Sequence, residues 1–236
     1  MKKLLFFYLL ISSTYLFSQD TIFIDRHYKE TLDKSTAIFY SIKERSAENA
    51  DAGYNRLYWI SGQIKKEEYF SSFKEEVLEG KKTLWKEDGS LWTESEYVKG
   101  KLHGYLISYW ENGQLKRKDL YKKGKLKEKK VWDSTGKAIT WYPMEVHPRF
   151  PGGKSGLENY IKANAKKPNG VAGGKVVVGF VIDIDGSITD VRIEETSSFA
   201  LNLSAYNVVA KMPAWKPGER DGEIVRVKYS IPLVFR

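Results

Sequence analysis

Few residues of this chain have the types and spacing that catalysis or metal binding requires. The sequence contains no cysteine, which excludes disulfides and thiolate metal sites. Its three histidines, His27, His103 and His147, are far apart and share no metal-ligand spacing. We therefore expect them to be surface or turn residues, and we predict no metal site.

Two short glycine-containing segments have compositions that occur in ligand sites. Asp183-Ile-Asp-Gly-Ser187 offers carboxylates for calcium, but the further acidic ligands and distal glutamate of an EF-hand loop are missing. Gly152-Gly153-Lys154-Ser155 resembles the tail of a phosphate-binding loop, but the upstream glycine and preceding strand are missing. We predict a hairpin turn at Asp185-Gly186. No catalytic residue and no cofactor is expected, so the chain is predicted not to be an enzyme.

The basic N-terminus precedes an apolar run, the pattern of a secretory signal. The run from Leu4 to Phe17 is shorter than the about 20 residues that a membrane-spanning helix needs. We predict a cleaved signal peptide over residues 1–19 and a protein located in the periplasm. If the segment is retained, it would anchor the chain in the inner membrane.

The chain is basic, with a formal net charge of +9. Its lysines are interleaved with glutamates along the whole sequence, which favours a solvated basic surface and predicts no nucleic-acid partner. Contact with anionic lipid or another polyanion remains an alternative for these lysines.

Glycines in turn-forming sequences recur at a fixed period in the middle of the chain. Gly113 follows Gly89 by 24 residues, and Gly136 follows Gly113 by 23. Each has an aromatic residue four positions before it: Trp85, Tyr109 and Trp132. The pattern predicts an array of β-hairpins that stack through their aromatic side chains, with both turn residues of Asp88-Gly89 at positive φ.

Two segments of this array carry a family resemblance, Gly100-Lys-Leu-His-Gly-Tyr105 and Tyr109-Trp-Glu-Asn-Gly-Gln-Leu115. They resemble the MORN-like repeats of the YwqK antitoxin type. The repeats cover about residues 53–142, and lead-in strands at Thr21–Asp25 and Ala37–Tyr40 extend the domain to residues 20–142. The resemblance implies lipid contact. Protein binding and glycan binding are further alternatives, and a purely structural role for the aromatics is the simpler interpretation.

Beyond Tyr142-Pro143 the pattern changes to alternating strands and helices. We predict a helix over Ser155–Ala165 capped by Ser155, with Leu157, Tyr160, Ile161 and Asn164 at helical spacing. A second helix is predicted over Leu203–Lys211, capped by Asn202 and ended by Pro213. Leu201, Ala205, Val208 or Val209, and Met212 are expected to share its buried face.

The remaining segments of this region read as strands. Lys175–Ile182 and Ile188–Glu195 should pair through the turn at Asp185-Gly186, and Trp215 should fill the interface between sheet and helices. The last strand alternates apolar and polar residues, so one face should be buried. Pro232 has no N–H, which predicts that this strand lies at the edge of its sheet.

The C-terminal region resembles the TonB C-terminal domain of Bacteroidota energy transducers. The resemblance rests on Lys211-Met-Pro-Ala-Trp-Lys-Pro-Gly218, on the final strand and on Phe150-Pro-Gly-Gly153, and it runs from about Phe150 to Phe235. It implies an α+β fold in residues 143–236, with two helices packed on one face of an antiparallel sheet. The expected fold class is therefore mainly β with two domains.

The resemblance also implies that partners bind by adding a β-strand to the exposed edge. The predicted partner-binding residues are those of the final strand, mainly through their backbone: Ile224, Val225, Arg226, Val227, Lys228, Tyr229, Ser230, Ile231, Leu233, Val234 and Phe235.

Three functions fit these patterns. The first is a periplasmic adaptor that docks an outer-membrane receptor or another envelope protein, as a monomer or a strand-swapped dimer. The second is an energy transducer for TonB-dependent transport, which needs a retained membrane helix and a proline-rich spacer that the sequence does not show. The third is a lipid- or polyanion-surface binder that acts through the basic repeats.

Overall fold

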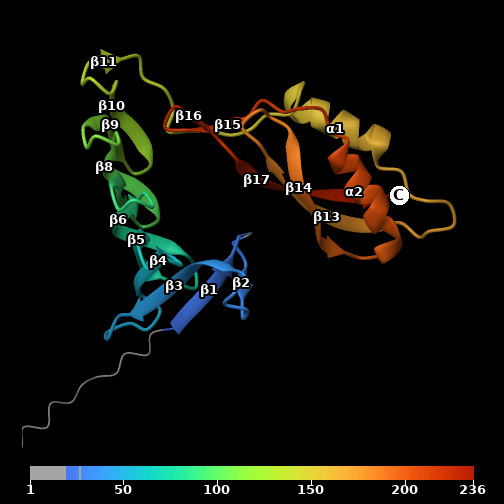
Figure 1. The fold of residues 1–236 in the computed structure, drawn as a ribbon, viewed down its shortest axis with the longest axis horizontal. Coiled ribbons are helices and arrows are strands. Elements are labelled where there is room, and N and C mark those ends of the chain that lie inside the picture. Colours follow the sequence, from blue (N-terminus) through green and yellow to red (C-terminus); the bar gives the residue numbers. More distant parts are fainter. Residues whose placement is uncertain (1–19, 27) are drawn as a thin grey trace, which may run out of the picture. The chain divides into compact units, whose positions relative to one another are not determined.

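The computed structural model describes residues 20–26 and 28–236 (Figure 1). The predicted signal peptide and His27 lie outside these residues. The chain divides into two compact units. We call residues up to Trp141 the N-terminal unit and Tyr142–Arg236 the C-terminal unit. Among residues 20–26 and 28–236, no helix has the length and hydropathy of a membrane span.

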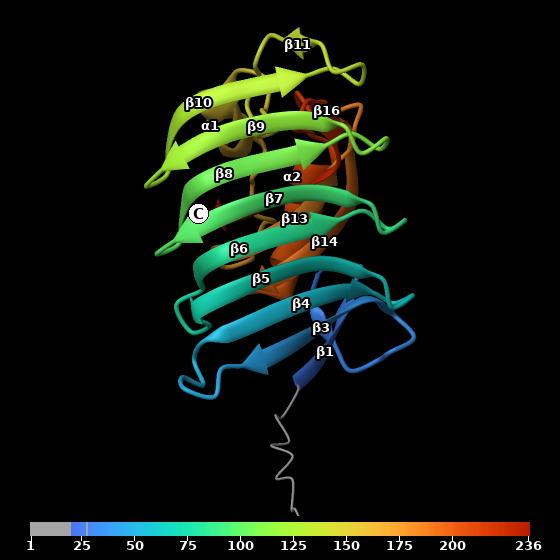
Figure 2. The same ribbon diagram turned by 90° about the vertical axis from the view of Figure 1, so that its left-hand side faces the viewer.

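The described residues of the N-terminal unit form one antiparallel sheet of eleven strands, with the order β11-β10-β9-β8-β7-β6-β5-β4-β3-β1-β2. Figure 2 shows the longer strands side by side in sequence order. The strands are β1 (Asp20–Asp25), β2 (Glu30–Thr31), β3 (Ala37–Arg45), β4 (Gly53–Trp59), β5 (Ile64–Ser72), β6 (Val77–Trp85), β7 (Leu91–Val98), β8 (Lys101–Tyr109), β9 (Leu115–Lys122), β10 (Lys125–Trp132) and β11 (Ala138–Ile139).

The predicted hairpins are present, but they are joined differently from the prediction. Successive hairpins continue one hydrogen-bonded ladder, for example where Ser95 of β7 faces Leu106 of β8 and Leu106 faces Asp119 of β9. The prediction of hairpins stacked through aromatic faces is therefore wrong. Backbone pairing between every neighbouring pair of strands provides the regular contact instead.

The sheet has two rims with different turns. On one rim, Gly89 donates its N–H to Lys86 O at 3.0 Å, and Lys86 N donates to Ser90 O at 2.8 Å. Gly89 alone has positive φ, which gives a three-residue loop with a glycine bulge. On the other rim, both residues of Lys99-Gly100 have positive φ, as a two-residue type I′ turn requires.

The prediction that both Asp88 and Gly89 have positive φ is therefore wrong, although the hairpin itself is present. The Asp88 side chain accepts from the N–H of Ser90 at 2.8 Å, which stabilises the loop without left-handed backbone at Asp88. An Asp-Gly pair with both φ values positive does occur, at Asp221-Gly222 in the C-terminal unit.

Polar residues form much of the buried interior of the N-terminal unit. Arg117 and Asp119, both fully buried on β9, form an ion pair of 2.6 Å. Trp141 donates its indole N–H to Asp119 at 3.1 Å, and Lys66 and Lys82 both pair with buried Glu68. The described residues of this unit include no helix, and a single sheet has little apolar volume to enclose. These buried charges are therefore satisfied by each other.

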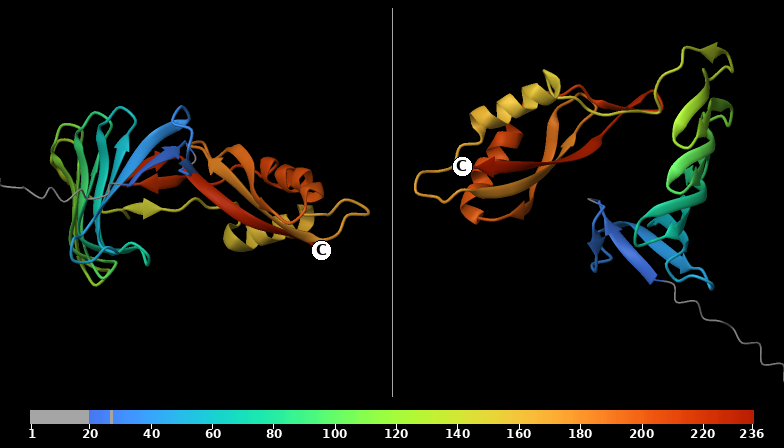
Figure 3. Two further views of the ribbon diagram at one scale, coloured as in Figure 1. Left: turned by 90° about the horizontal axis from the view of Figure 1, so that it is seen from below. Right: turned by 180° about the vertical axis from the view of Figure 1, so that it is seen from behind.

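The C-terminal unit contains a three-stranded antiparallel sheet with the order β14-β13-β17. Its strands are β13 (Gly174–Ile182), β14 (Ile188–Thr196) and β17 (Val227–Phe235). The helices α1 (Gly153–Asn164) and α2 (Asn202–Ala210) pack against the same core, and a short 3₁₀ turn, η1 (Phe199–Leu201), leads into α2 (Figure 3). A small second sheet has the order β12-β15-β16 and comprises β12 (Glu145–Val146), β15 (Gly218–Arg220) and β16 (Glu223–Val225).

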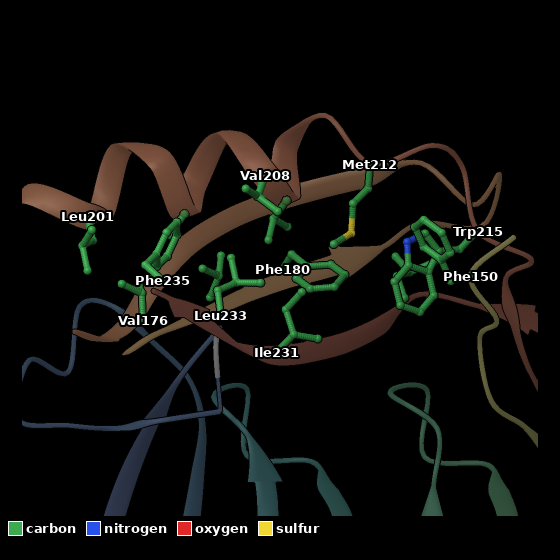
Figure 4. Packing of buried hydrophobic residues seen from close by; sticks show 14 residues of the cluster. Phe150, Val176, Phe180, Leu201, Val208, Met212, Trp215, Ile231, Leu233 and Phe235 are labelled. Atoms are coloured by element: carbon green, nitrogen blue, oxygen red, sulfur yellow. The ribbon is translucent and has the colours of Figure 1, made fainter. Parts of the chain in front are cut away.

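One apolar cluster holds this unit together (Figure 4). Phe180 of β13 and Leu233 of β17 are fully buried beneath the helices. The predicted inner face of α2 is confirmed, since Leu201, Ala205, Val208, Val209 and Met212 are all buried. Trp215 is also confirmed at the interface, with its ring centroid 5.4 Å from that of Phe150 and 5.9 Å from that of Phe180.

Both predicted helix caps are wrong. The first helix begins at Gly153, because Gly152 and Gly153 have left-handed φ values and turn the chain two residues before Ser155. The second helix follows η1 directly, so Asn202 has helical dihedrals and not the extended backbone of a capping residue. Neither helix has a side-chain cap hydrogen bond.

Candidate partner-binding edge

The predicted binding segment, Ile224–Phe235, forms two strands in two different sheets. The type I′ turn at Asp221-Gly222 pairs β16 back on β15, with Val225 opposite Gly218. Beyond Arg226 the chain joins the other sheet, where Val227 faces Ile182 of β13. The prediction of one continuous strand is therefore wrong, and Ile224 and Val225 belong to the smaller sheet.

Within β17 the predicted alternation of faces is confirmed. Ile231, Leu233 and Phe235 are buried toward the helices, and Tyr229 is half-buried on the same face. Lys228, Ser230, Pro232 and Val234 are exposed on the opposite face. The strand therefore packs against the helices through Tyr229, Ile231, Leu233 and Phe235.

The backbone of β17 faces an open edge, because β17 is the last strand of its sheet. The contacts of Lys175 on β13 show which backbone groups of β17 point outward. The C=O of Lys175 accepts a hydrogen bond from the N–H of Ser197 at 3.0 Å, so it points to the β14 side of β13. The backbone groups of Lys175 therefore point away from its β17 partner, Val234. The pairing has no register shift, so the backbone groups of Lys228, Ser230, Pro232 and Val234 point away from β13.

Pro232 limits what this edge offers to a partner. Its position on an edge strand, predicted from its missing N–H, is confirmed. The outward row has carbonyl acceptors at Lys228, Ser230, Pro232 and Val234, but N–H donors only at Lys228, Ser230 and Val234. An incoming strand would therefore find donors at Ser230 and Val234, on either side of the missing N–H of Pro232.

A polar network on the solvent face ties the edge to the rest of the sheet. Ser230 donates its hydroxyl to Glu194 of β14 at 2.7 Å, and Arg192 pairs with Glu194 at 2.7 Å. The side chains of Glu194 and Arg192 lie over Gly179 of β13, where a Cβ would collide with the Glu194 carboxylate. The network therefore depends on a glycine in the central strand and holds Ser230 in place.

The turn that precedes β14 supports Trp215. Trp215 donates its backbone N–H to Gly186 O at 2.8 Å, and a Cβ on Gly186 would collide with the Trp215 carbonyl oxygen. The hydroxyl and N–H of Ser187 lower the pKa of Asp185 by donating to its carboxylate. The predicted turn is confirmed, since Asp183 N donates to Ser187 O at 2.9 Å and Gly186 has positive φ.

The described residues contain no group of three or more histidine, cysteine or acidic side chains arranged to hold a metal ion. The polar atoms at the edge instead belong to the backbone and to the Arg192, Glu194 and Ser230 network. This arrangement has the chemistry of a peptide-binding surface, with donors and acceptors along one strand.

Residues 169–236 match the family model described as Gram-negative bacterial TonB protein C-terminal. This part of the chain is similar to a TonB C-terminal domain. The match covers β13, β14, α2 and β15–β17 and confirms the predicted resemblance over these residues; it begins after α1 and leaves the MORN-like resemblance a prediction. No curated protein and no solved structure matches the chain.

Sequence reasoning missed a hollow beside β17, lined by Arg149, Lys154 and three aromatic residues. Phe150 lies 65 residues before Trp215, and Tyr229 lies 14 residues after it, so only the folded chain brings the three aromatics together. The sequence signal that could have located the hollow was the TonB-like pattern around Trp215, which places this residue at the interface between the sheet and the helices.

Proposed function

We propose that this chain is a periplasmic binding protein whose TonB-like C-terminal unit docks a protein partner by β-strand addition along β17. The observation that carries the proposal is the open edge of β17, with outward N–H groups at Ser230 and Val234 in the region of the family match. Unpaired backbone groups on an edge strand are a template for another strand. The role is binding and not catalysis.

The proposed partner is a protein of the cell envelope, such as an outer-membrane receptor. The family to which residues 169–236 are similar belongs to the Gram-negative TonB system, which supports an envelope location. The N-terminal unit, with its repeated hairpins of MORN-like type, would hold a second partner and make the chain an adaptor.

Site-directed photocrosslinking in intact cells tests strand addition. A photoreactive residue at Val234, which is exposed at the edge, should give a defined adduct with one envelope protein. The same residue at Lys162, exposed on α1, is the matched control and should give none. Ser230→Pro removes an outward donor and should abolish the Val234 adduct. Equal adducts from both positions, or an adduct that survives Ser230→Pro, would contradict the proposal.

The fate of residues 1–19 separates the adaptor from an energy transducer. An intact mass that corresponds to a chain beginning near Gln19 or Asp20 supports a free periplasmic adaptor. A mass that corresponds to a chain retaining Met1 supports an anchored form and makes the energy transducer the favoured function.

A second candidate function follows from the rim of type I′ turns in the N-terminal unit. Two neighbouring turns carry exposed lysines, and Gly124 N donates to Leu102 O at 2.7 Å, which brings the turns together. The lysines are Lys99, Lys101, Lys122, Lys123 and Lys125. Strands in a sheet are about 4.8 Å apart, so this cluster is dense enough to attract an anionic surface.

Vesicle sedimentation tests this second candidate. Binding to phosphatidylglycerol vesicles should be lost in Lys99→Gln/Lys123→Gln and kept in Lys137→Gln, a lysine of the opposite rim. It should also weaken steeply with salt, because exposed charges are screened. Binding that is insensitive to salt, or equal to phosphatidylcholine vesicles, would contradict it.

A further inference from the structure

A hollow of about 470 Å³ lies in the C-terminal unit between the start of α1 and β17. Phe150, Trp215 and Tyr229 form aromatic walls, and the ring centroids of Trp215 and Tyr229 are 5.2 Å apart. Figure 4 shows Phe150 and Trp215 side by side at one end of the apolar cluster. The hollow therefore has rigid apolar walls that suit the methylene groups of a side chain.

The charge around the hollow is positive. Arg149 and Lys154 line it, and no carboxylate does. Among the described residues, the Arg149 guanidinium has no ion pair, and Lys154 has only one contact, 3.9 Å from Glu158, with its side chain 91% exposed. Both cations are thus available to an anionic group.

The start of α1 adds to the positive character of the hollow. The helix begins here with no capping side chain and no acidic residue in its first turn. The N-terminal end of a helix carries a partial positive charge, so this end and the two cations together favour an anionic ligand.

The position of Tyr229 connects the hollow to the edge of β17. Its side chain points to the helix face of the sheet, and the outer side of β17 is open. A strand added at that edge places every second side chain on the same face. The residue opposite Tyr229 in the added strand therefore lies beside the hollow.

We propose that the hollow takes an acidic side chain of the partner strand, placed opposite Tyr229. Arg149 supplies the principal charge, and the aromatic walls hold the methylene groups. The inference rests on the proposed strand addition and names the chemistry of the partner: an extended segment with a glutamate at one helix-facing position. The ion pair between the partner's carboxylate and Arg149 fixes the register of the added strand, which Pro232 alone does not determine.

Synthetic nine-residue peptides test the proposal on the full chain. The sequence acetyl-Val-Thr-Val-Thr-Xaa-Thr-Val-Thr-Val-amide places Xaa and valines on one face, with Xaa as Glu, Gln or Leu. Dissociation constants from isothermal titration should favour the Glu peptide over the Gln peptide by about tenfold, since a charge-assisted hydrogen bond replaces a neutral one.

Variants of Arg149 assign this preference to the hollow. Arg149→Gln should remove the preference for the Glu peptide and leave Gln-peptide binding unchanged, and Arg149→Lys should restore part of it. The backbone of Arg149 is held by two hydrogen bonds to Lys216, of 2.9 and 2.8 Å, so the side-chain changes should leave the fold intact. Lys162→Gln is the matched control and should change the affinity for the Glu peptide by less than about twofold.

The outcomes separate the two proposals. Equal binding of all three peptides, or a Glu preference that survives Arg149→Gln, overturns the acidic pocket and leaves strand addition standing. Binding of no peptide overturns both.

Discussion

The two units of this chain enclose different kinds of residue. The C-terminal unit buries one apolar cluster of β13, β17 and α2, whereas the buried residues of the N-terminal unit include Glu68, Arg117 and Asp119. A sheet covered by helices has an interior that excludes water, but a sheet without helices has to satisfy its strands through pairing. We infer that apolar packing stabilises the C-terminal unit, and that backbone ladders, turns and ion pairs stabilise the N-terminal unit.

The largest effect is expected in the apolar cluster. Phe180→Ala removes a fully buried ring that packs against both Trp215 and Tyr229, and it should destabilise the C-terminal unit by about 4 kcal/mol. Urea unfolding followed by two-dimensional NMR resolves the two units. The control, Val234→Ala, changes a half-exposed residue and should cost less than about 0.5 kcal/mol. A loss below about 1 kcal/mol for Phe180→Ala would contradict the importance of packing.

The next effect concerns the buried ion pair of the N-terminal unit. Asp119→Leu leaves the Arg117 charge buried without its carboxylate and should cost about 3 kcal/mol. The double variant Arg117→Met/Asp119→Leu should recover most of that loss. The same urea titration measures both, and the C-terminal unit should be unchanged. Equal losses in the single and double variants would show that the pair acts only through its volume.

A smaller effect is expected at the type I′ turns. Gly124 has φ of +76° with no close neighbour that a Cβ would strike, so Gly124→Ala should cost about 1–2 kcal/mol from backbone strain alone. Lys123→Gly, at the other left-handed position of this turn, relieves strain and should cost less than about 0.5 kcal/mol. Thermal melting measures both changes. A larger loss for Lys123→Gly would reverse the argument.

The smallest effect is a difference in acid sensitivity. Hydrogen bonds from serine or threonine hydroxyls and from backbone N–H groups lower the pKa of several turn aspartates below the ordinary range. In the N-terminal unit these are Asp33, Asp51, Asp88 and Asp133, and in the C-terminal unit Asp185. A carboxyl with a lowered folded-state pKa stabilises the fold above its unfolded pKa and loses that contribution as pH falls through the folded value.

Melting curves between pH 6 and pH 3 should therefore show the N-terminal unit losing more stability than the C-terminal unit below about pH 4. Asp88→Asn/Asp133→Asn should reduce this pH dependence. If the C-terminal unit loses stability equally, the turn aspartates do not distinguish the two units.

Local patterns in the sequence predicted much of the C-terminal unit. The alternation in β17, the inner face of α2 and the position of Trp215 depend on residues close in sequence and on a recognised motif. The break at Arg226 could not be predicted this way, because it depends on whether β15 or β13 is the pairing partner. The predicted caps failed for a related reason, since neighbouring glycines and η1 changed where each helix begins.

In the N-terminal unit the repeat period predicted the hairpins but not their joining. Asp-Gly pairs form both loop types in this chain, so the dipeptide does not determine whether the aspartate has positive φ. The burial of Arg117 and Asp119 was also not predicted, because charged residues at alternate positions usually indicate a solvated strand face.

Residue-resolved amide hydrogen exchange of the full chain tests the central claim, the open edge of β17, most directly. We expect the N–H groups of Ser230 and Val234 to exchange rapidly, while those of Tyr229, Ile231 and Leu233 are protected by pairing with β13. Addition of the Glu peptide should then protect Ser230 and Val234. Protection of these two amides before any peptide is added, or no change on its addition, would contradict docking at this edge.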